Sequence, residues 1–226
     1  MKALRVTGVA GERLHAVRVA GVELVVGVVP RAPRATAATL RRYDGAIRDL
    51  MAVYASVLPA RFATCASQVE EIAASVRDRR MAIRRNLRLV RHRVQMTIRI
   101  FAPHPGSDRG QSRLGPGSES GSDRGQSRLG PGSESEYEGA RGTRYLQQRA
   151  ADLQIPGAEP LRTAAARWVR AERSERHAQG RLTGSLYHLV PRGSVAAYQR
   201  AVERAAVDSG LTTIVSGPWP PYAFTE

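Results

Sequence analysis

The residues best suited to chemistry are scattered through this chain, and their spacing indicates no metal site. The five histidines are His15, His92, His104, His177 and His188. None of them pairs with another at the i, i+4 spacing that places two imidazoles on one face of a helix. No ligand cluster forms along the sequence either, so no metal is expected to bind.

The other reactive groups fit structural roles. Cys65 is the only cysteine, which excludes an internal disulfide framework. Arginines and a predicted helix start near it could activate its thiol, but no histidine partner is identifiable, so a buried structural cysteine is favoured. The carboxylates are few and mostly flanked by arginine, as in helix-dipole and i±3/4 pairs. No phosphate loop is present. We therefore predict no enzyme and no cofactor.

The net charge of +15 raises the possibility of a nucleic-acid partner. Of the 35 basic residues, Lys2 is the only lysine, which leaves 34 arginines. That skew, with abundant alanine, glycine and valine, is typical of a GC-rich genome and does not require selection for phosphate binding. Aromatic residues make up only 5% of the chain. An acidic protein partner or a solvated surface is therefore favoured, with a basic nucleic-acid-binding module as the alternative.

A predicted helix at about 67–93 positions a dense group of these arginines. Ser67 and Glu70 form a capping box at its start, and an apolar stripe follows from Val69 to Val90. The opposite face carries arginines at positions 77, 80, 84, 85, 88 and 91. Two interpretations stay open: a solvated face, or a docking surface for acidic groups formed by Arg77, Arg80, Arg84, Arg88 and Arg91.

The segment Ser216–Thr225 holds three prolines and three aromatic residues. It is neither helix interior nor central strand, and a disordered tail would not usually carry so many aromatics. We expect a rigid, extended docking element that leaves the last sheet edge. Trp219, Tyr222 and Phe224 should be largely buried and fasten two domains together.

The remaining pattern predicts an α+β fold. Three short strands are expected in residues 1–30, a helix at about 37–56 and a strand at 94–101. After residue 144 we expect helices at 145–153 and 161–177, a strand at 182–190, a helix capped by Ser194 and ended by Gly210, and a strand at 211–215. The order suggests two domains, 1–93 and 94–226, the second a modified α+β sandwich of the ferredoxin-like type, and strand 94–101 could belong to either side of this boundary.

Residues 103–139 have a different composition. The fifteen residues at 106–120 are repeated without change at 121–135. Glycine, serine, proline and charge dominate, with one leucine per copy, so the segment has too little apolar surface to fold. We predict a flexible, duplicated insertion within the second domain.

Three motifs resemble the gas vesicle protein F/L family. Gly-Pro-Trp-Pro-Pro-Tyr-Ala-Phe at 217–224 is similar to its carboxy-terminal signature, and Leu-Pro-Ala-Arg-Phe-Ala-Thr at 58–64 is similar to its Leu-Pro-x-Arg-Phe-Gly-Thr segment. Gly142–Leu146 is like its Gly-x-x-Tyr-Leu. The motif residues are Leu58, Pro59, Arg61, Phe62, Thr64, Tyr145, Gly217, Pro218, Trp219, Pro220, Pro221, Tyr222 and Phe224. Ala63 departs from the family, which usually has glycine there. For Arg61 we favour a buried, ion-paired role over ligand binding.

The resemblance implies two α+β domains, the second a modified ferredoxin-like fold with extra helices, and a non-enzymatic accessory or minor structural protein of the gas vesicle. Its partners would be the hydrophobic shell protein and other vesicle accessory proteins, bound during nucleation or assembly. The chain start lacks a signal-peptide pattern, and no apolar run approaches the ~20 residues that cross a bilayer. A cytoplasmic protein associated with gas vesicles is therefore expected.

Overall fold

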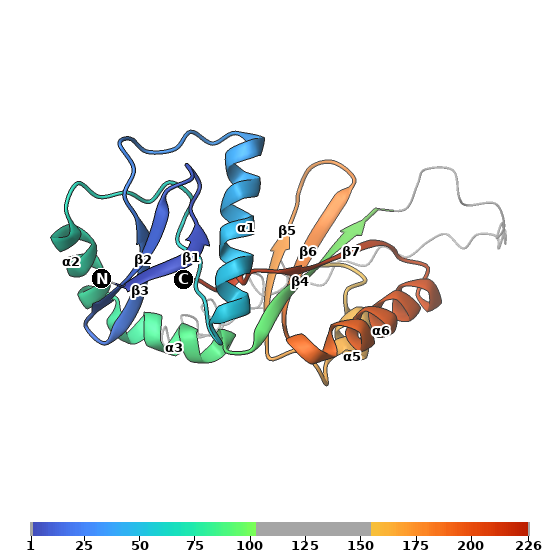
Figure 1. Cartoon of the computed structure of the whole chain (residues 1–226). Helices are drawn as coiled ribbons and strands as arrows, with labels where there is room; N and C mark the ends of the chain where they lie inside the picture. Colours follow the sequence, from blue (N-terminus) through green and yellow to red (C-terminus); the bar gives the residue numbers. More distant parts are fainter. Residues whose placement is uncertain (1, 103–154, 226) are drawn as a thin grey trace, which may run out of the picture.

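The computed structural model describes residues 2–102 and 155–225, with side chains from residue 4 onward. The predicted helix at 145–153, the duplicated insertion and the Gly142–Leu146 motif with Tyr145 lie outside the described residues. The described part is a mixed α+β structure with two antiparallel sheets (Figure 1).

The first sheet consists of the three strands expected near the N-terminus. Strands β1 (Lys2–Thr7), β2 (Arg13–Val19) and β3 (Val22–Gly27) pair in the order β1-β2-β3. A two-residue turn at Ala20 and Gly21, with φ of 48° and 75°, joins β2 to β3. Positive φ at both positions is the type I′ geometry that matches the twist of a hairpin, which explains why glycine occurs there.

Helix α1 (Ala37–Val53) packs along this sheet. Thr36 caps it, because its side chain accepts a hydrogen bond from the Thr39 amide at 3.2 Å. Apolar side chains of α1 meet those of the strands in a small core that contains Val6, Leu14, Ala46 and Leu50. The helix predicted for this region is confirmed, although it ends three residues earlier than expected.

The single helix predicted at 67–93 is wrong: two helices are present, α2 (Val69–Asp78) and α3 (Arg80–Val90). Arg79, with φ −98° and ψ 7°, separates them. The break lets α2 pack against β2 while α3 carries Val90 to another core, which one straight helix could not do. The capping box is also wrong. Gln68 is the N-cap without a side-chain bond, and the Ser67 amide donates to Glu71 at 3.4 Å.

The second sheet has four strands in the order β5-β6-β4-β7, every neighbouring pair antiparallel. They are β4 (Arg93–Phe101), β5 (Ala171–Arg176), β6 (Leu182–Pro191) and β7 (Thr212–Trp219). Helices α5 (Glu159–Ala165) and α6 (Val195–Asp208) cover one face (Figure 1). The main core lies between the sheet and these two helices and includes Met96, Ile98, Leu186, Tyr198 and Val202.

The helix predicted at 161–177 is wrong beyond Ala165. It ends at Ala165, and Ala171–Arg176 forms the edge strand β5. The polar segment has little local preference for a strand, but β6 supplies a backbone partner along its whole length. Helix α6 is confirmed and is followed by Gly210 at φ 63°, although Ser194 makes no side-chain cap bond.

Strand β7 also differs from the prediction. It runs to Trp219, so the first residues of the aromatic and proline-rich segment stay paired with β4 and do not leave the sheet at once. Pro218 is tolerated because β7 is an edge strand. A short 3-10 turn, Tyr222–Phe224, follows. None of the helices in the described ranges has the length and apolar character to cross a membrane.

Candidate functional site: a motif junction on helix α1

Two of the three sequence motifs meet on one side of α1. The residues of α1 that receive them are Tyr43, Asp44 and Arg48, which lie at i, i+1 and i+5. Asp44 and Arg48 form an ion pair at 2.6 Å along the helix surface. We call this region the motif junction: these three residues, segment 58–64 and segment 217–224.

Segment 58–64 is held to α1 mainly through Tyr43. The Tyr43 hydroxyl donates a hydrogen bond to the Ala60 carbonyl, and the Phe62 ring stands edge-on to the Tyr43 ring with 5.5 Å between centroids. Burial raises the pKa of Tyr43 to about 12, so the hydroxyl stays protonated and remains a donor. Pro59 is buried. The motif residues therefore fix the path of the chain beyond α1.

A tight turn closes this segment. The amide and the hydroxyl of Thr64 both donate to the Arg61 carbonyl, at 3.0 and 2.7 Å. Ala63 lies between them with φ of 60°, the left-handed region that favours glycine. Glycine, which the similar motif has at this position, would adopt this conformation without strain.

Two side chains near this turn differ from the predictions. Arg61 is exposed and makes no ion pair with another described residue, so the buried, ion-paired role is wrong. The fold uses its carbonyl and leaves its guanidinium in solvent. Cys65 is likewise exposed, because it follows the turn on the surface; a buried structural cysteine is wrong.

Segment 217–224 approaches α1 from the far end of the sequence. Gly217 has φ of 123°, and a Cβ there would lie 2.8 Å from the Gln95 carbonyl oxygen. Only glycine fits that approach. The next carbonyl, that of Pro218, accepts a hydrogen bond from Arg48 Nη1 at 3.1 Å. The Arg48 guanidinium also lies over the Trp219 ring, 5.0 Å from its centroid.

The three aromatic residues of the segment have different surroundings. Phe224 is 3% exposed, as predicted, whereas Trp219 and Tyr222 are each 37% exposed, so the expectation of burial is wrong for those two. Each of these two rings contacts α1 on one side and is exposed to solvent on the other. The Tyr222 hydroxyl donates to Asp44 Oδ1 at 2.9 Å. Partial burial and this bond to the carboxylate raise the Tyr222 pKa.

Phe224 joins the two motifs to a shared apolar cluster. It packs with Val90 of α3 and Leu189 of β6, and Leu58 of the other motif lies against the same cluster. The Ala223 amide donates to the side chain of Gln95, a buried residue of β4, at 2.8 Å. Pro220 and Pro221 are buried as well. The segment therefore contacts α1, α3 and both central strands of the second sheet.

Arg192 is a residue of this region that the sequence did not single out. It lies in the 3-10 turn Arg192–Ser194, and its Nη1 donates to the Met51 carbonyl at 2.7 Å, with Nη2 3.5 Å from the Tyr54 carbonyl. A guanidinium at the C-terminal end of α1 complements the helix dipole. No local pattern marks this role, because the two groups are distant in sequence.

A second missed feature is a buried polar cluster in the second sheet. His188 is fully buried, and its Nε2 is 2.8 Å from Glu172 Oε2 while its Nδ1 is 2.8 Å from the Tyr198 hydroxyl. A carboxylate only accepts, so Nε2 carries a proton, and Nδ1 shares a hydrogen bond with the Tyr198 hydroxyl. Arg162 donates to the other Glu172 oxygen at 2.9 Å.

The Glu172 carboxyl responds to two opposed effects. Partial burial acts to raise its pKa, but the hydrogen bonds from His188 and Arg162 outweigh it, so the net pKa is lowered. Burial raises the pKa of Tyr198, and the Glu172 charge adds to that effect. Every polar atom of the His188 ring has a partner. The cluster satisfies buried polar groups, which favours a structural role.

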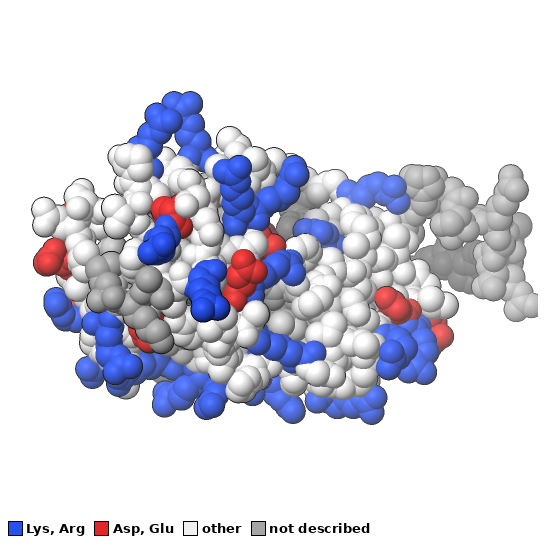
Figure 2. Space-filling view, in the orientation of Figure 1, with Lys and Arg blue, Asp and Glu red and all other residues white. Residues whose placement is uncertain are grey.

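The predicted basic residues Arg77, Arg80, Arg84, Arg85, Arg88 and Arg91 are all exposed. Figure 2 shows blue side chains along the lower margin of the molecule, where Figure 1 places α3. The face is separate from the motif junction, which meets α3 through Val90 on its buried side.

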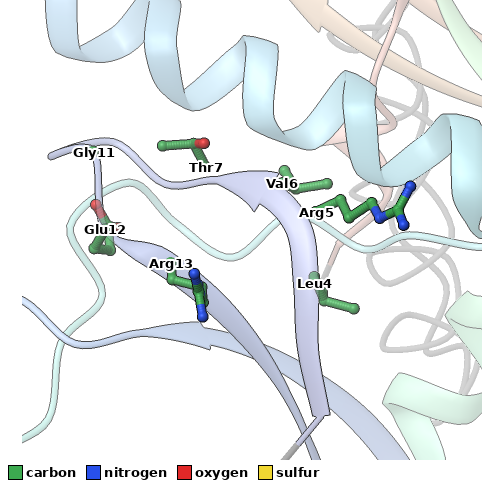
Figure 3. A pocket seen from close by; sticks show the side chains of 7 residues that line it. All are labelled: Leu4, Arg5, Val6, Thr7, Gly11, Glu12 and Arg13. Carbon is green, nitrogen blue, oxygen red and sulfur yellow. The ribbon is translucent and has the colours of Figure 1, made fainter.

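One shallow depression lies on the β1–β2 hairpin, lined by residues 4–7 and 11–13. Figure 3 shows that its side chains point in different directions and do not converge. The Glu12 carboxylate makes a local hydrogen bond, because its Oε2 accepts a hydrogen bond from the Ala10 amide at 2.7 Å. Within the described ranges no three His, Cys, Asp or Glu residues gather as metal ligands would.

Comparisons with known proteins agree with the motifs. The family model described as "Gas vesicle synthesis protein GvpL/GvpF" matches residues 1–226. The crystal structure of gas vesicle protein GvpF from Microcystis aeruginosa is similar with a TM-score of 0.66 at 12% identity, over 99% of this chain and 92% of that one. GvpF from Anabaena sp. PCC7120 is similar with a TM-score of 0.64 at 12% identity, over 99% and 91%. No protein with a curated description matches.

Proposed function

Because the chain belongs to the GvpL/GvpF family of gas vesicle synthesis proteins, we propose that it is a non-enzymatic accessory or minor structural protein of gas vesicle formation. Its partners would be the hydrophobic shell protein and other vesicle accessory proteins, which it binds during nucleation or assembly. We also propose a cytoplasmic location beside the vesicles. The motif junction carries the proposal, because two family motifs that are far apart in sequence converge there on α1.

We propose that the chain has two domains that the motif junction joins. The strand order β5-β6-β4-β7, with helices before β5 and between β6 and β7, supports a modified ferredoxin-like second domain. The N-terminal sheet has its own core with α1. Asp44 and Arg48 belong to that part, whereas their partners Tyr222 and Pro218 follow the second sheet.

A shell subunit must be kept from aggregating through its apolar faces. An open strand edge of a partner can bind an extended segment of the subunit by strand addition. The outer strands differ in how well they could do this. Strand β5 carries four charged residues in six, and β7 contains Pro218, both of which oppose strand addition. Strand β3 has one charged residue, Glu23, among valine and leucine, so we propose its free edge as the docking place for the shell protein.

The geometry of β3 defines a test. Because a two-residue turn joins β2 and β3, the backbone groups of Val22, Leu24 and Val26 face β2, and those of Glu23 and Val25 face outward. Glu23→Pro removes an outward donor and leaves the β2–β3 ladder in place. Glu23→Thr keeps the donor and is the matched control. We expect Glu23→Pro to reduce recovery of shell protein in a pull-down with the tagged full chain, and Glu23→Thr to retain it.

The vesicle role itself is tested by deletion and complementation. Removing the gene should abolish or reduce vesicles, counted by electron microscopy, and the wild-type gene should restore them. Unchanged vesicles after deletion, or pull-downs that recover no vesicle protein, would refute the proposal. If vesicles are lost but Glu23→Pro complements fully, the role stands and only the docking place is wrong. The alternative is a basic, ferredoxin-like nucleic-acid-binding module, and its specific support is the net charge of +15.

A further inference from the structure

The exposed face of α3 combines positive charge with an apolar centre. Met81 is 68% exposed, and Arg84, Arg85 and Arg88 follow it at i+3, i+4 and i+7, so the four side chains share one stripe of the helix. All three arginines are exposed. The opposite side of α3 is buried through Asn86 and Val90. The helix is thus fixed to the fold on one side and presents this stripe on the other.

The arginines of the stripe are not neutralised by their own surroundings. In the described part of the chain, no carboxylate forms an ion pair with any of them. Arg84 reaches the carbonyls of Ala20 and Gly21, both at 3.5 Å, which leaves its charge uncompensated. Like charges at i, i+4, as at Arg84 and Arg88, disfavour an isolated helix. A partner that supplies negative charge would remove this repulsion.

The spacing of the arginines along α3 indicates which kind of partner could supply this negative charge. Arg80, Arg84 and Arg88 recur every four residues, about 6 Å along the axis. Carboxylates that recur every four residues on another helix have the same spacing, and a guanidinium binds a carboxylate through two parallel hydrogen bonds. Arginine and methionine are also enriched at protein interfaces, and a flexible thioether adapts to apolar side chains of different shape.

We propose that this stripe, Met81 with Arg84, Arg85 and Arg88 and with Arg80 at its margin, binds an acidic amphipathic helix of a partner protein. Its Glu or Asp residues would pair with the arginines, and one apolar side chain would pack on Met81. A protein helix is favoured over nucleic acid for two reasons. Residues 69–90 contain no aromatic side chain on which a base could stack, and Met81 is an apolar centre where phosphates would otherwise lie.

The proposed binding of an acidic helix uses a second surface, on the side of α3 away from the motif junction. It does not depend on the proposed vesicle role. A defined peptide can fail to bind while deletion of the gene still abolishes vesicles, and the reverse is equally possible, so the two failures are distinguishable.

The test uses the full chain and a fluorescein-labelled helical peptide with glutamates at i, i+4 and leucines beside them. A scrambled peptide of the same composition and a DNA duplex are the comparison probes. Fluorescence anisotropy at about 0.05 M and about 0.3 M salt gives affinity and its salt dependence. Arg84→Glu/Arg88→Glu should weaken binding at least about tenfold. Arg200→Glu/Arg204→Glu, an exposed i, i+4 pair on α6, makes the same charge change elsewhere and should alter it less than about twofold.

Met81→Gln tests the apolar centre. It should weaken peptide binding about threefold to tenfold without changing the salt dependence. The proposal is overturned if both double variants lose affinity equally, if Met81→Gln has no effect, if the scrambled peptide binds as well, or if the duplex binds more tightly than the peptide. Circular dichroism checks folding. If Arg84→Glu/Arg88→Glu is misfolded, Arg85→Gln/Arg88→Gln replaces it, because neither residue makes a described contact with the β2–β3 turn.

Discussion

Replacing Ala63 by glycine should stabilise the protein, although glycine usually destabilises. Ala63 holds φ of 60°, a conformation that costs a residue with a Cβ about 1–2 kcal/mol and costs glycine nothing. Glycine gains conformational freedom in the unfolded chain, which offsets about 0.4–1 kcal/mol of that relief. Ala63 is exposed, so removing its methyl group sacrifices no packing. The net expectation is a gain of about 0.5–1 kcal/mol, or roughly 1–4 °C in Tm for a chain of this size.

The matched control is Ala66→Gly. Ala66 is also exposed and lies three residues away, but its φ is not positive. There the unfolded-state effect acts alone, so stability should fall by about 0.4–1 kcal/mol. Urea denaturation of the two variants and the wild type, followed by circular dichroism, measures both changes under one condition. Opposite signs support the reasoning. If Ala63→Gly is no more stable than Ala66→Gly, the left-handed turn is not present in the protein and the account of this motif is wrong.

Three further perturbations should have measurable effects. Gly217→Ala should destabilise the protein by about 2 kcal/mol or more in urea denaturation, because the new Cβ meets the Gln95 carbonyl at φ of 123°; unchanged stability would contradict the close approach. Arg192→Ala should cost about 2 kcal/mol by removing charged donors from the end of α1, and a Tm equal to wild type would show that these bonds contribute nothing. Glu172 has a lowered pKa, so its contribution is complete above the ordinary value of 4.5 and is lost as the pH falls through the lowered value. Wild type should therefore exceed Glu172→Gln in stability at pH 7, the difference should vanish on acidification, and a constant difference would exclude linkage through this carboxyl.

The sequence predicted those elements whose pattern is local. Alternating and helical apolar spacing located the first three strands, α1, β4, β6 and α6. Strand β5 was not predicted, because Ala171–Arg176 becomes a strand only through pairing with β6, a contact that composition does not encode. The break at Arg79 was missed for a related reason. The apolar stripe continues through Arg79, and only the different packing partners of α2 and α3 require two helices.

The candidate site was predictable in its parts and not in its assembly. Both motif segments were expected to be ordered. No local sequence pattern, however, indicates that Tyr43, Asp44 and Arg48 of α1 contact these segments. The Arg61 prediction was wrong because the turn uses its carbonyl. Glu172, His188 and Tyr198 come together from β5, β6 and α6, and no sequence spacing relates them.

The bond from Arg48 to the Pro218 carbonyl spans 170 residues, which has a consequence during biosynthesis. At about 5–20 residues per second, the ribosome needs roughly 10–30 s between making α1 and making its partner segment. Until that segment is made, Leu58 and Val90 lack the Phe224 side chain that completes their apolar cluster. A nascent chain therefore carries an unfinished apolar surface for many seconds, and any cellular factor that protects it must act before segment 217–224 arrives.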